Sequence, residues 1–423
     1  MKKTLIILAT LISLTIPLSA FTLDPLYPSH RIFEIGFDSQ AAVTNNYFNA
    51  KDLLVKDIVI DLKKIADGIP SNGLMLNAFF SAPELFWNLN LPNGFHLGSA
   101  YGLEGSVTGN IGKNLFELIG YGNADSTTIN VDGYAKADVF AYFNISAGIK
   151  LDSMRITVTP AIFMPILHAE TSSMSAQVKN PEDGSIQVVA SAFGTVYTPT
   201  DISYLGDSNK SADTEKIIRD ISSGAGFDLA GAVELPVFSF LQAGGYARIP
   251  IVPGHLKHSA TGTASLKYTA DSLTDIINGD SESDSDISDI TYGTSDYYIS
   301  RPLRLGAEAA FRPFGNWFTV RTLLGLGVQY PYTSDFKFYS EYSIGAEIDL
   351  FKIIGMSLST SYLSQMFIHK LNCMINLRIL ELNFAAFLAG SGGAENAADF
   401  GTEFANSFKG TGAGAQVSVR IGF

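Results

Sequence analysis

Apolar and polar positions alternate along much of this chain, and the alternation is clearest at its end. From Ala415 to Phe423 every odd-numbered residue is apolar, and every even-numbered residue is polar or glycine. Because a β-strand turns successive side chains to opposite faces, this segment predicts a strand with one apolar and one polar face. On its own, such a strand would also suit the edge of an ordinary sheet.

The same alternation recurs upstream, and the length of the segments distinguishes two kinds of β-protein. The segments are 31–38, 95–107, 139–149, 154–163, 185–197, 225–235, 238–249, 255–268, 303–312, 318–329, 337–350, 356–363, 370–378, 380–388 and 415–423. A tilted strand needs about 9–11 residues to cross the hydrocarbon of a bilayer, whereas strands of soluble proteins typically have about 5–6. The pattern therefore predicts an all-β fold, a transmembrane antiparallel β-barrel of about fourteen strands, with about twelve or about sixteen as alternatives. The barrel must be closed, because an open edge in lipid would leave backbone N–H and C=O groups without hydrogen bonds.

The composition fits alternating strands better than long apolar helices. Hydrophobic residues make up 46% of the chain and charged residues only 16%. Beyond Leu18, however, no uncharged apolar run is long enough to span a bilayer as a helix. Aromatic residues beside the segments, such as Trp317, Tyr330 and Tyr332, are typical of the girdles at the membrane interfaces. The formal net charge of −13 argues against nucleic acid as a partner, because phosphate recognition needs a basic patch.

The N-terminus predicts export. Lys2 and Lys3 precede an almost uncharged apolar run, and small residues follow at Ser19 and Ala20. A basic start, a short apolar run and a small residue at the cleavage site are typical of a secretory signal peptide. We expect residues 1–20 to be removed and the mature protein to reside in the bacterial outer membrane, surrounded by membrane lipid.

The segment 21–72 departs from the strand pattern after its early strand at 31–38. Leu54, Ile58, Leu62 and Ile65 follow helical spacing, so part of this segment is expected to be helical. Two interpretations stay open. The segment either plugs the lumen of a barrel formed by 73–423, or it forms helices in a loop.

Two further stretches also lack the pattern. A short helix is predicted over 114–121. Residues 271–299 carry many carboxylates interleaved with serine. Such a segment predicts a solvated, mobile loop on the extracellular side, where the long loops of such barrels lie. Because Ca²⁺ prefers several carboxylate oxygens, a calcium site there is the alternative.

The lumen is where function is expected, because inward positions carry charged side chains of both signs. The lumen-lining candidates are Glu104, Arg304, Glu308, Arg312, Arg321, Glu341, Glu347, Asp349 and Arg420. They would form either ion-pair ladders that hold the lumen in shape or a lining that selects charged solutes. No catalytic residue, cofactor or metal site is predicted. The six histidines are scattered, and His255 and His258 would point to opposite faces of one strand.

The chain as a whole resembles two groups of bacterial outer-membrane proteins. The final strand ending in Phe423 resembles the C-terminal signal that the barrel-assembly machinery reads, which implies that machinery as a partner. Together with the signal peptide and the possible plug, the layout resembles the FadL-type fatty-acid channels and an uncharacterised FadL-like family. The stretch from Phe37 to Phe48 is the part most similar to the latter. The Asn-Pro-Ala motif of the FadL hatch does not occur in this sequence, so no ligand-contacting residue is carried over.

The resemblance implies an outer-membrane channel or transporter for small molecules, hydrophobic ones included, and it leaves the solute unnamed. The alternative is a structural or surface-interaction barrel, similar to an adhesin, whose lumen stays closed. The two differ in whether a solute passes through the lumen.

Overall fold

β-strands make up most of the described chain. The computed structural model describes residues 31–48, 61–121, 129–179, 186–205, 213–270, 282–363, 366–390 and 411–423. The expected signal peptide over residues 1–20 lies outside them. So do residues 21–30 and 49–60 of the N-terminal segment and residues 271–281 of the acidic segment.

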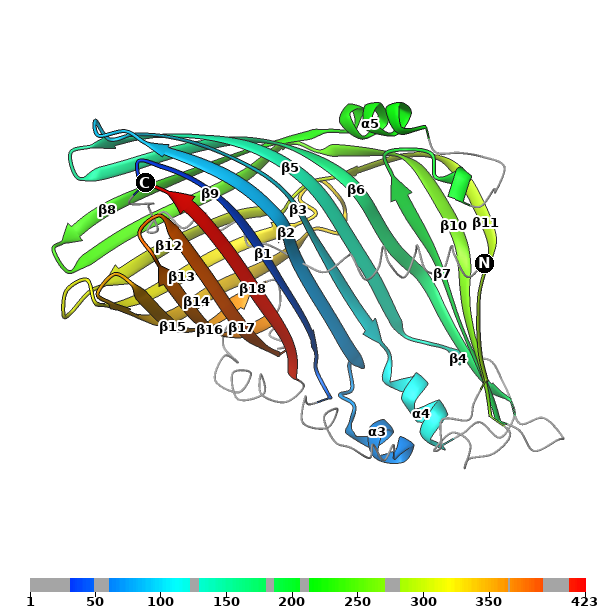
Figure 1. Cartoon of the computed structure of the whole chain (residues 1–423). Coiled ribbons are helices and arrows are strands. Elements are labelled where there is room, and N and C mark those ends of the chain that lie inside the picture. The colour runs from blue at the N-terminus through cyan, green and yellow to red at the C-terminus, as the bar shows by residue number, and fades with distance from the viewer. Residues whose placement is uncertain are drawn as a thin grey trace.

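Fourteen strands form a closed antiparallel barrel, in agreement with the predicted fold and strand number. Each strand pairs with the next, and the last returns to the first (Figure 1). In ring order the strands are β1 (Phe33–Asn45), β2 (Leu74–Asn90), β3 (Phe95–Ile111), β5 (Gly133–Leu151), β6 (Met154–Lys179), β8 (Gly226–Phe238), β9 (Leu241–Val252), β12 (Leu303–Phe311), β13 (Phe318–Gln329), β14 (Lys337–Leu350), β15 (Ile354–Leu363), β16 (Met366–Asn376), β17 (Leu380–Gly390) and β18 (Thr411–Gly422).

The C-terminal strand closes the ring against the first one. β1 and β18 pair without a register shift from Glu34 with Gly422 to Val43 with Ala413. At the end of this seam, the Phe33 N–H donates to the Phe423 carbonyl at 3.1 Å, and the Phe423 N–H donates back at 3.0 Å. The expected division of the chain at residue 72 therefore differs from the structure, because β1 is a wall strand rather than part of a plug. A plug formed by residues 21–30 or 49–60 stays a prediction.

A sheet extension, which we call the lobe, continues β6 beyond the ring. The first part of β6 pairs with β8, and its second part, from His168 to Lys179, pairs with β7 (Ile186–Thr198). β7 pairs with β10 (Gly254–Ala270), which in turn pairs with β11 (Glu282–Ile299). The short β4 (Ile129–Asn130) also pairs with β6. The lobe is thus the second part of β6 together with β7, β10 and β11.

The acidic segment was wrongly predicted to be a loop over its second part, which is strand β11. Asp284 and Asp286 lie opposite Lys267 and Ser265 of β10. Among the described residues, β11 pairs with β10 alone and is therefore an edge strand. Charged residues are common on edge strands because they discourage pairing with a further strand. Residues 271–281 of the expected loop lie outside the described residues.

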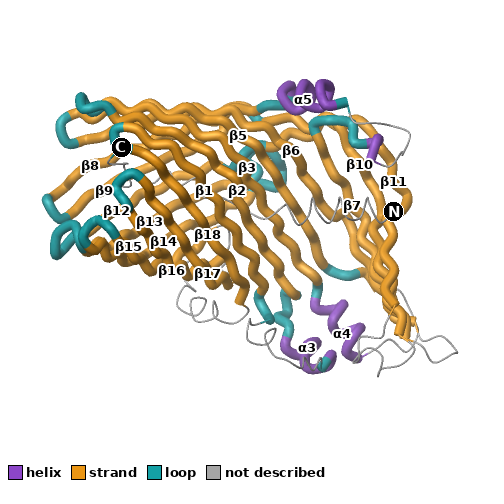
Figure 2. The backbone as a smooth tube through the Cα atoms, in the orientation of Figure 1, coloured by secondary structure: helices purple, strands orange, loops and turns teal. Residues whose placement is uncertain are grey.

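The two ends of the barrel differ. The C-terminus and tight turns, such as Asp152–Ser153 and Ser239–Phe240, lie at one end. The helices α3 (Leu62–Gly68), α4 (Lys113–Tyr121) and α5 (Thr214–Ser223) lie toward the other end, with a single turn η1 (Ser203–Leu205) (Figure 2). Helix α4 confirms the prediction over 114–121. In the described part of the chain, no helix combines the length and the apolarity needed to cross a membrane.

The outer face of the barrel carries large apolar side chains. Leu324 and Leu326 of β13 are 69% and 66% exposed, and Phe338 of β14 is 77% exposed. Thr319 and Glu341 on the same two strands have the opposite parity and are buried. The alternation predicted from the sequence is therefore the alternation between the outside and the lumen.

Candidate functional site

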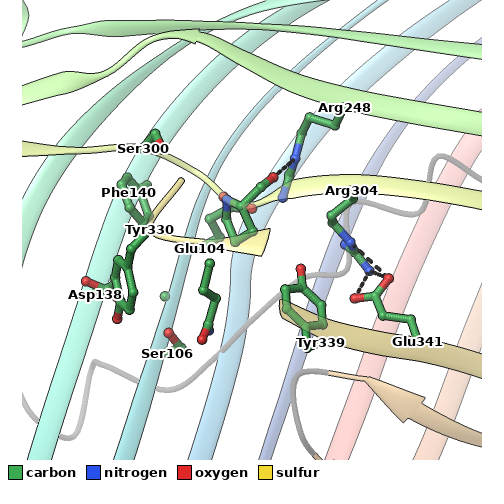
Figure 3. Close-up of a pocket in the computed structure, with 13 residues that line it drawn as sticks. Glu104, Ser106, Asp138, Phe140, Arg248, Ser300, Arg304, Tyr330, Tyr339 and Glu341 are labelled. Atoms are coloured by element: carbon green, nitrogen blue, oxygen red, sulfur yellow. Dashed lines mark hydrogen bonds and ion pairs between the residues drawn. The ribbon is translucent and has the colours of Figure 1, made fainter. Parts of the chain in front are cut away.

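Three of the predicted lumen residues meet in the middle of the barrel. Arg304 on β12 faces Glu341 on β14, with β13 between the two strands (Figure 3). The Arg304 Nη2 donates to Glu341 Oε1 at 2.7 Å and Oε2 at 2.6 Å, and its Nε donates to Oε2 at 3.1 Å. Glu104 of β3 lines the same cavity. This arrangement matches the ion-pair interpretation of the predicted lining.

Arg301, which the sequence analysis missed, is the centre of the site. It lies in the short junction between β11 and β12 and is 1% exposed. Its Nε and Nη2 donate to the two carboxylate oxygens of Glu104 at 2.5 and 3.1 Å, and its Nη1 donates to Asp228 Oδ2 on β8 at 3.0 Å. Such forked contacts fix the orientation of the guanidinium and hold its positive charge beside the carboxylates.

An aromatic ring extends this network to β2. The Arg301 guanidinium lies 4.6 Å from the ring centre of Tyr142 on β5, a distance that favours cation–π attraction. The Tyr142 hydroxyl donates to Glu84 on β2. Gly102 permits this approach, because a Cβ atom there would lie 2.8 Å from the Tyr142 hydroxyl oxygen. Arg301 is thus connected with four wall strands, namely β2, β3, β5 and β8.

A small cavity beside this network is lined from opposite sides of the barrel. Glu104 and Phe140 come from β3 and β5, while Tyr339 and Glu341 come from β14, which lies half the ring away from β3 (Figure 3). The volume of the cavity is about 40 Å³. This is room for only a few water molecules. Side chains from opposite walls therefore occupy the lumen here.

Opposite walls also touch directly. Tyr330, just after β13, donates from its hydroxyl to Asp138 Oδ2 on β5 at 2.6 Å. The other Asp138 oxygen lies 2.6 Å from Nδ1 of His168, a fully buried residue of β6. His168 stacks on Tyr297 of β11 with ring centres 4.7 Å apart, and the Tyr297 hydroxyl lies 3.0 Å from Nε2. These contacts bind the lobe to both walls.

We call the groups that join separate parts of the barrel the pinch. They are Glu104, Asp138, Asp228, Arg301 and Tyr330. Of these, only Glu104 was predicted as a lumen residue. Asp228 could have been found, because it occupies an inward position of the predicted strand 225–235. Asp138 directly precedes the predicted strand 139–149, and Arg301 lies outside every predicted strand.

The other predicted lumen residues lie along the wall. Arg321 pairs with Glu347 on the neighbouring strand, with Nε 3.3 Å from Oε2. Elsewhere the Arg312 Nη1 donates to Gln242 at 2.5 Å, and the Arg420 Nε lies 3.8 Å from a carboxylate oxygen of Glu381. The remaining two, Glu308 of β12 and Asp349 of β14, share the inward parity of Arg304 and Glu341. These residues are distributed over the lumen rather than gathered in one site.

The wall itself is interrupted in β2. Between Ser81 and Leu85, β2 carries one residue more than the facing stretches of β1 and β3, so the register shifts on both of its edges. Pro83 lies in this bulge and has no N–H to donate to a neighbouring strand. The bulge turns Glu84 toward Tyr142. Bulges in barrels re-aim a side chain and end the regular pairing of a strand, and both effects occur here.

Metal coordination receives no support from the described side chains, since none of them forms a group of three or more His, Cys, Asp or Glu suited to an ion. Cys373 is exposed and not in a disulfide. The chemistry of the described lumen is thus that of ion pairs, hydrogen bonds and aromatic rings.

Comparisons with known proteins give similarity in structure only. No protein-family model matches the sequence, and no curated protein matches it. The structure of the toluene transporter TbuX of Ralstonia pickettii is similar over 94% of this chain and 90% of its own, with a TM-score of 0.45 at 10% identity. The structure of the CymD monoaromatic hydrocarbon channel is similar over 93% of this chain and 89% of its own, with a TM-score of 0.46 at 9% identity.

A FadL homologue of Pseudomonas aeruginosa is also similar, over 92% of this chain and 90% of its own, with a TM-score of 0.41 at 8% identity. All three similarities extend over most of both chains, and 8–10% of the residues are identical.

Proposed function

We propose that this protein is an outer-membrane channel for small, hydrophobic molecules. The observation that carries the proposal is the polarity of the closed barrel, which is the reverse of that of a soluble protein. Leu324, Leu326 and Phe338 are exposed outside, whereas Arg301 and Glu341 are buried inside. Hydrocarbon chains of lipid would cover such an outer face, and a closed ring leaves no unpaired edge in the membrane.

The bulge in β2 supports a hydrophobic rather than a water-soluble solute. Opposite walls meet at the pinch, where the cavity is about 40 Å³. The bulge, in contrast, breaks the hydrogen-bond ladder on both edges of β2. A hydrophobic molecule could leave the lumen sideways into lipid at such a break, and it would not need an aqueous path past the pinch.

A second candidate function is the surface-interaction barrel with a closed lumen. The lobe favours it, because β11 presents acidic residues along one edge of a sheet that extends beyond the ring. In this case the lumen network would be purely structural. Transport measurements separate the two candidates.

The transport test uses Gram-negative cells, whose lipopolysaccharide leaflet slows the passage of hydrophobic compounds. Cells with and without this protein take up radiolabelled toluene, and radiolabelled lactose serves as the hydrophilic control. We expect the protein to speed toluene uptake and to leave lactose uptake unchanged. Equal toluene uptake in both cell types would favour the surface-interaction barrel.

Deletion of Pro83 tests the role of the bulge. Removing one residue makes β2 match β1 and β3 in length, so the ladder can continue on both edges. We expect a folded barrel with toluene uptake reduced to that of cells without the protein. A matched control is Pro236→Ala, which changes a proline at another register shift, between β8 and β9. Normal uptake by the deletion variant would contradict passage at the bulge.

We also propose that the barrel-assembly machinery recognises the strand that ends in Phe423. The ring of Phe423 is 72% exposed, and its centre lies 6.1 Å from that of Phe33. Deleting Phe423 should lower the amount of folded protein in outer membranes without preventing refolding of the purified chain in detergent. An equal loss in both settings would assign Phe423 to stability instead.

A further inference from the structure

Arg301 joins parts of the barrel that are not neighbours. It comes from the junction between β11 and β12, yet its guanidinium contacts Glu104 on β3 and Asp228 on β8. Neither strand pairs with β12. One side chain therefore fixes the junction against two separate wall strands.

Three acidic and two basic side chains of this cluster form ion pairs with one another. Arg301 is shared by the carboxylates of Glu104 and Asp228, and Arg304 is held by Glu341. All five side chains are less than one-tenth exposed. A lumen attracts ions when charged rings face a water-filled path. Paired and buried charges do the opposite, since their partners neutralise them and they leave little space for the water shell of a passing ion.

The closed arrangement is also held firmly. Moving Arg301 out of the lumen would leave two buried carboxylates without a cation, which is strongly unfavourable. The cavity beside Arg301 holds only a few water molecules, so little hydrated space lies next to the guanidinium there. Tyr330, just after β13, also donates across the barrel to Asp138 of β5.

We infer that the pinch is the barrier that excludes ions and hydrophilic solutes from this part of the lumen, and that Arg301 is its selectivity-determining residue. The inference rests on the proposed function as a membrane channel. In this inference Arg301, a residue of the junction between β11 and β12, excludes ions. The same barrier would keep out lactose, whereas toluene would leave the lumen at the bulge in β2.

The test is the ion conductance of the purified, refolded protein in planar lipid bilayers with potassium chloride on both sides. The main variant combines Arg301→Ala, Glu104→Ala and Asp228→Ala, which opens space by removing the cation together with both carboxylates that hold it. The control combines Arg321→Ala and Glu347→Ala, which removes an ion pair between neighbouring strands. We expect the triple variant to conduct several-fold more than the wild type, and the control to conduct as the wild type does.

Two outcomes would overturn the inference. One is a folded triple variant with wild-type conductance, and the other is a control variant whose conductance rises equally. Folding is checked by the change in electrophoretic mobility on heating, which folded barrels show in detergent. If the triple variant does not fold, Arg301→Lys takes its place, because a lysine keeps the charge but cannot hold two carboxylates with a planar fork. It is judged by the same comparison.

The transport and conductance results are separable. Failure of the wild type to speed toluene uptake would overturn the proposed function but would leave the conductance comparison intact. Wild-type conductance of the triple variant would overturn only the role of Arg301.

Discussion

Two arginines in the same lumen differ in what they connect. Arg301 joins the junction before β12 to β3 and β8, and its side chain is 2% exposed. Arg321 contacts Glu347 on the adjacent strand, and its side chain is 24% exposed. Because charges interact more strongly where water is excluded, the two contacts contribute very differently although their chemistry is the same. An ion pair between distant strands thus fixes the shape of the lumen, whereas an ion pair between adjacent strands only lines the wall.

The largest effect is expected for Arg301→Met. Methionine keeps much of the volume but leaves Glu104 and Asp228 buried without a cation. Breaking a buried ion pair in this way lowers the free energy of unfolding by about 3–5 kcal/mol. The measurement is unfolding of the barrel by guanidinium in lipid vesicles, followed by the fluorescence of Trp87 and Trp317, the two tryptophans of the chain.

A triple variant decides whether charge or packing causes this loss. Adding Glu104→Gln and Asp228→Asn to Arg301→Met removes the charges of the two carboxylates that lost Arg301, while keeping the shapes of the side chains. We expect most of the lost free energy of unfolding to return, because neutral buried groups cost much less than unpaired ions. A triple variant as unstable as the single one would assign the effect to packing.

Local periodicity explains which parts of the site the sequence could predict. A period of two decides the face of each strand residue, so Arg304, Arg321 and Glu341 could be assigned to one face of their strands. Which strands lie next to each other can also be inferred, for most of the ring, from their order along the chain. For these reasons the barrel and its strand number could be predicted.

The missed elements are those in which periodicity breaks. Arg301 lies between Ile299 and Pro302 in no periodic segment, and its partner Glu104 is 197 residues away in sequence. Strand β2 was missed because the bulge at Pro83 changes its inward parity from odd residues, such as Ser81, to even residues, such as Glu84. Contacts across a lumen depend on the shape of the whole ring, and no local pattern encodes them.

A smaller effect is expected for Arg321→Met. The pair with Glu347 is partly exposed to the lumen, with 24% and 18% of the two side chains accessible. Ion pairs in contact with water are worth about 0–1 kcal/mol, so the free energy of unfolding should fall by no more than this. The same guanidinium titration measures it. A loss as large as that of Arg301→Met would contradict the distinction between the two arginines.

The smallest effect is expected at the rim, where the loop residue Asp335 meets Lys136 of β5. The Lys136 Nζ lies 3.0 Å from Asp335 Oδ2, and the aspartate side chain is 59% exposed. The hydrogen bond and the charge of Lys136 lower the pKa of Asp335. The contact therefore stabilises the fold fully above the ordinary aspartate pKa of about 3.9, and the stabilisation disappears as the pH falls through the lowered value.

Asp335→Asn isolates this rim contact. At neutral pH the substitution should lower the free energy of unfolding by about 0.2–1 kcal/mol, as for other exposed pairs. Below the lowered pKa of Asp335 the wild type should lose the same amount, so the two proteins should become equally stable. A difference that persists in acid would mean that the carboxylate contributes through its shape rather than its charge. The rim contact would then differ in kind from the ion pairs of the lumen, and burial alone would no longer rank the three sites.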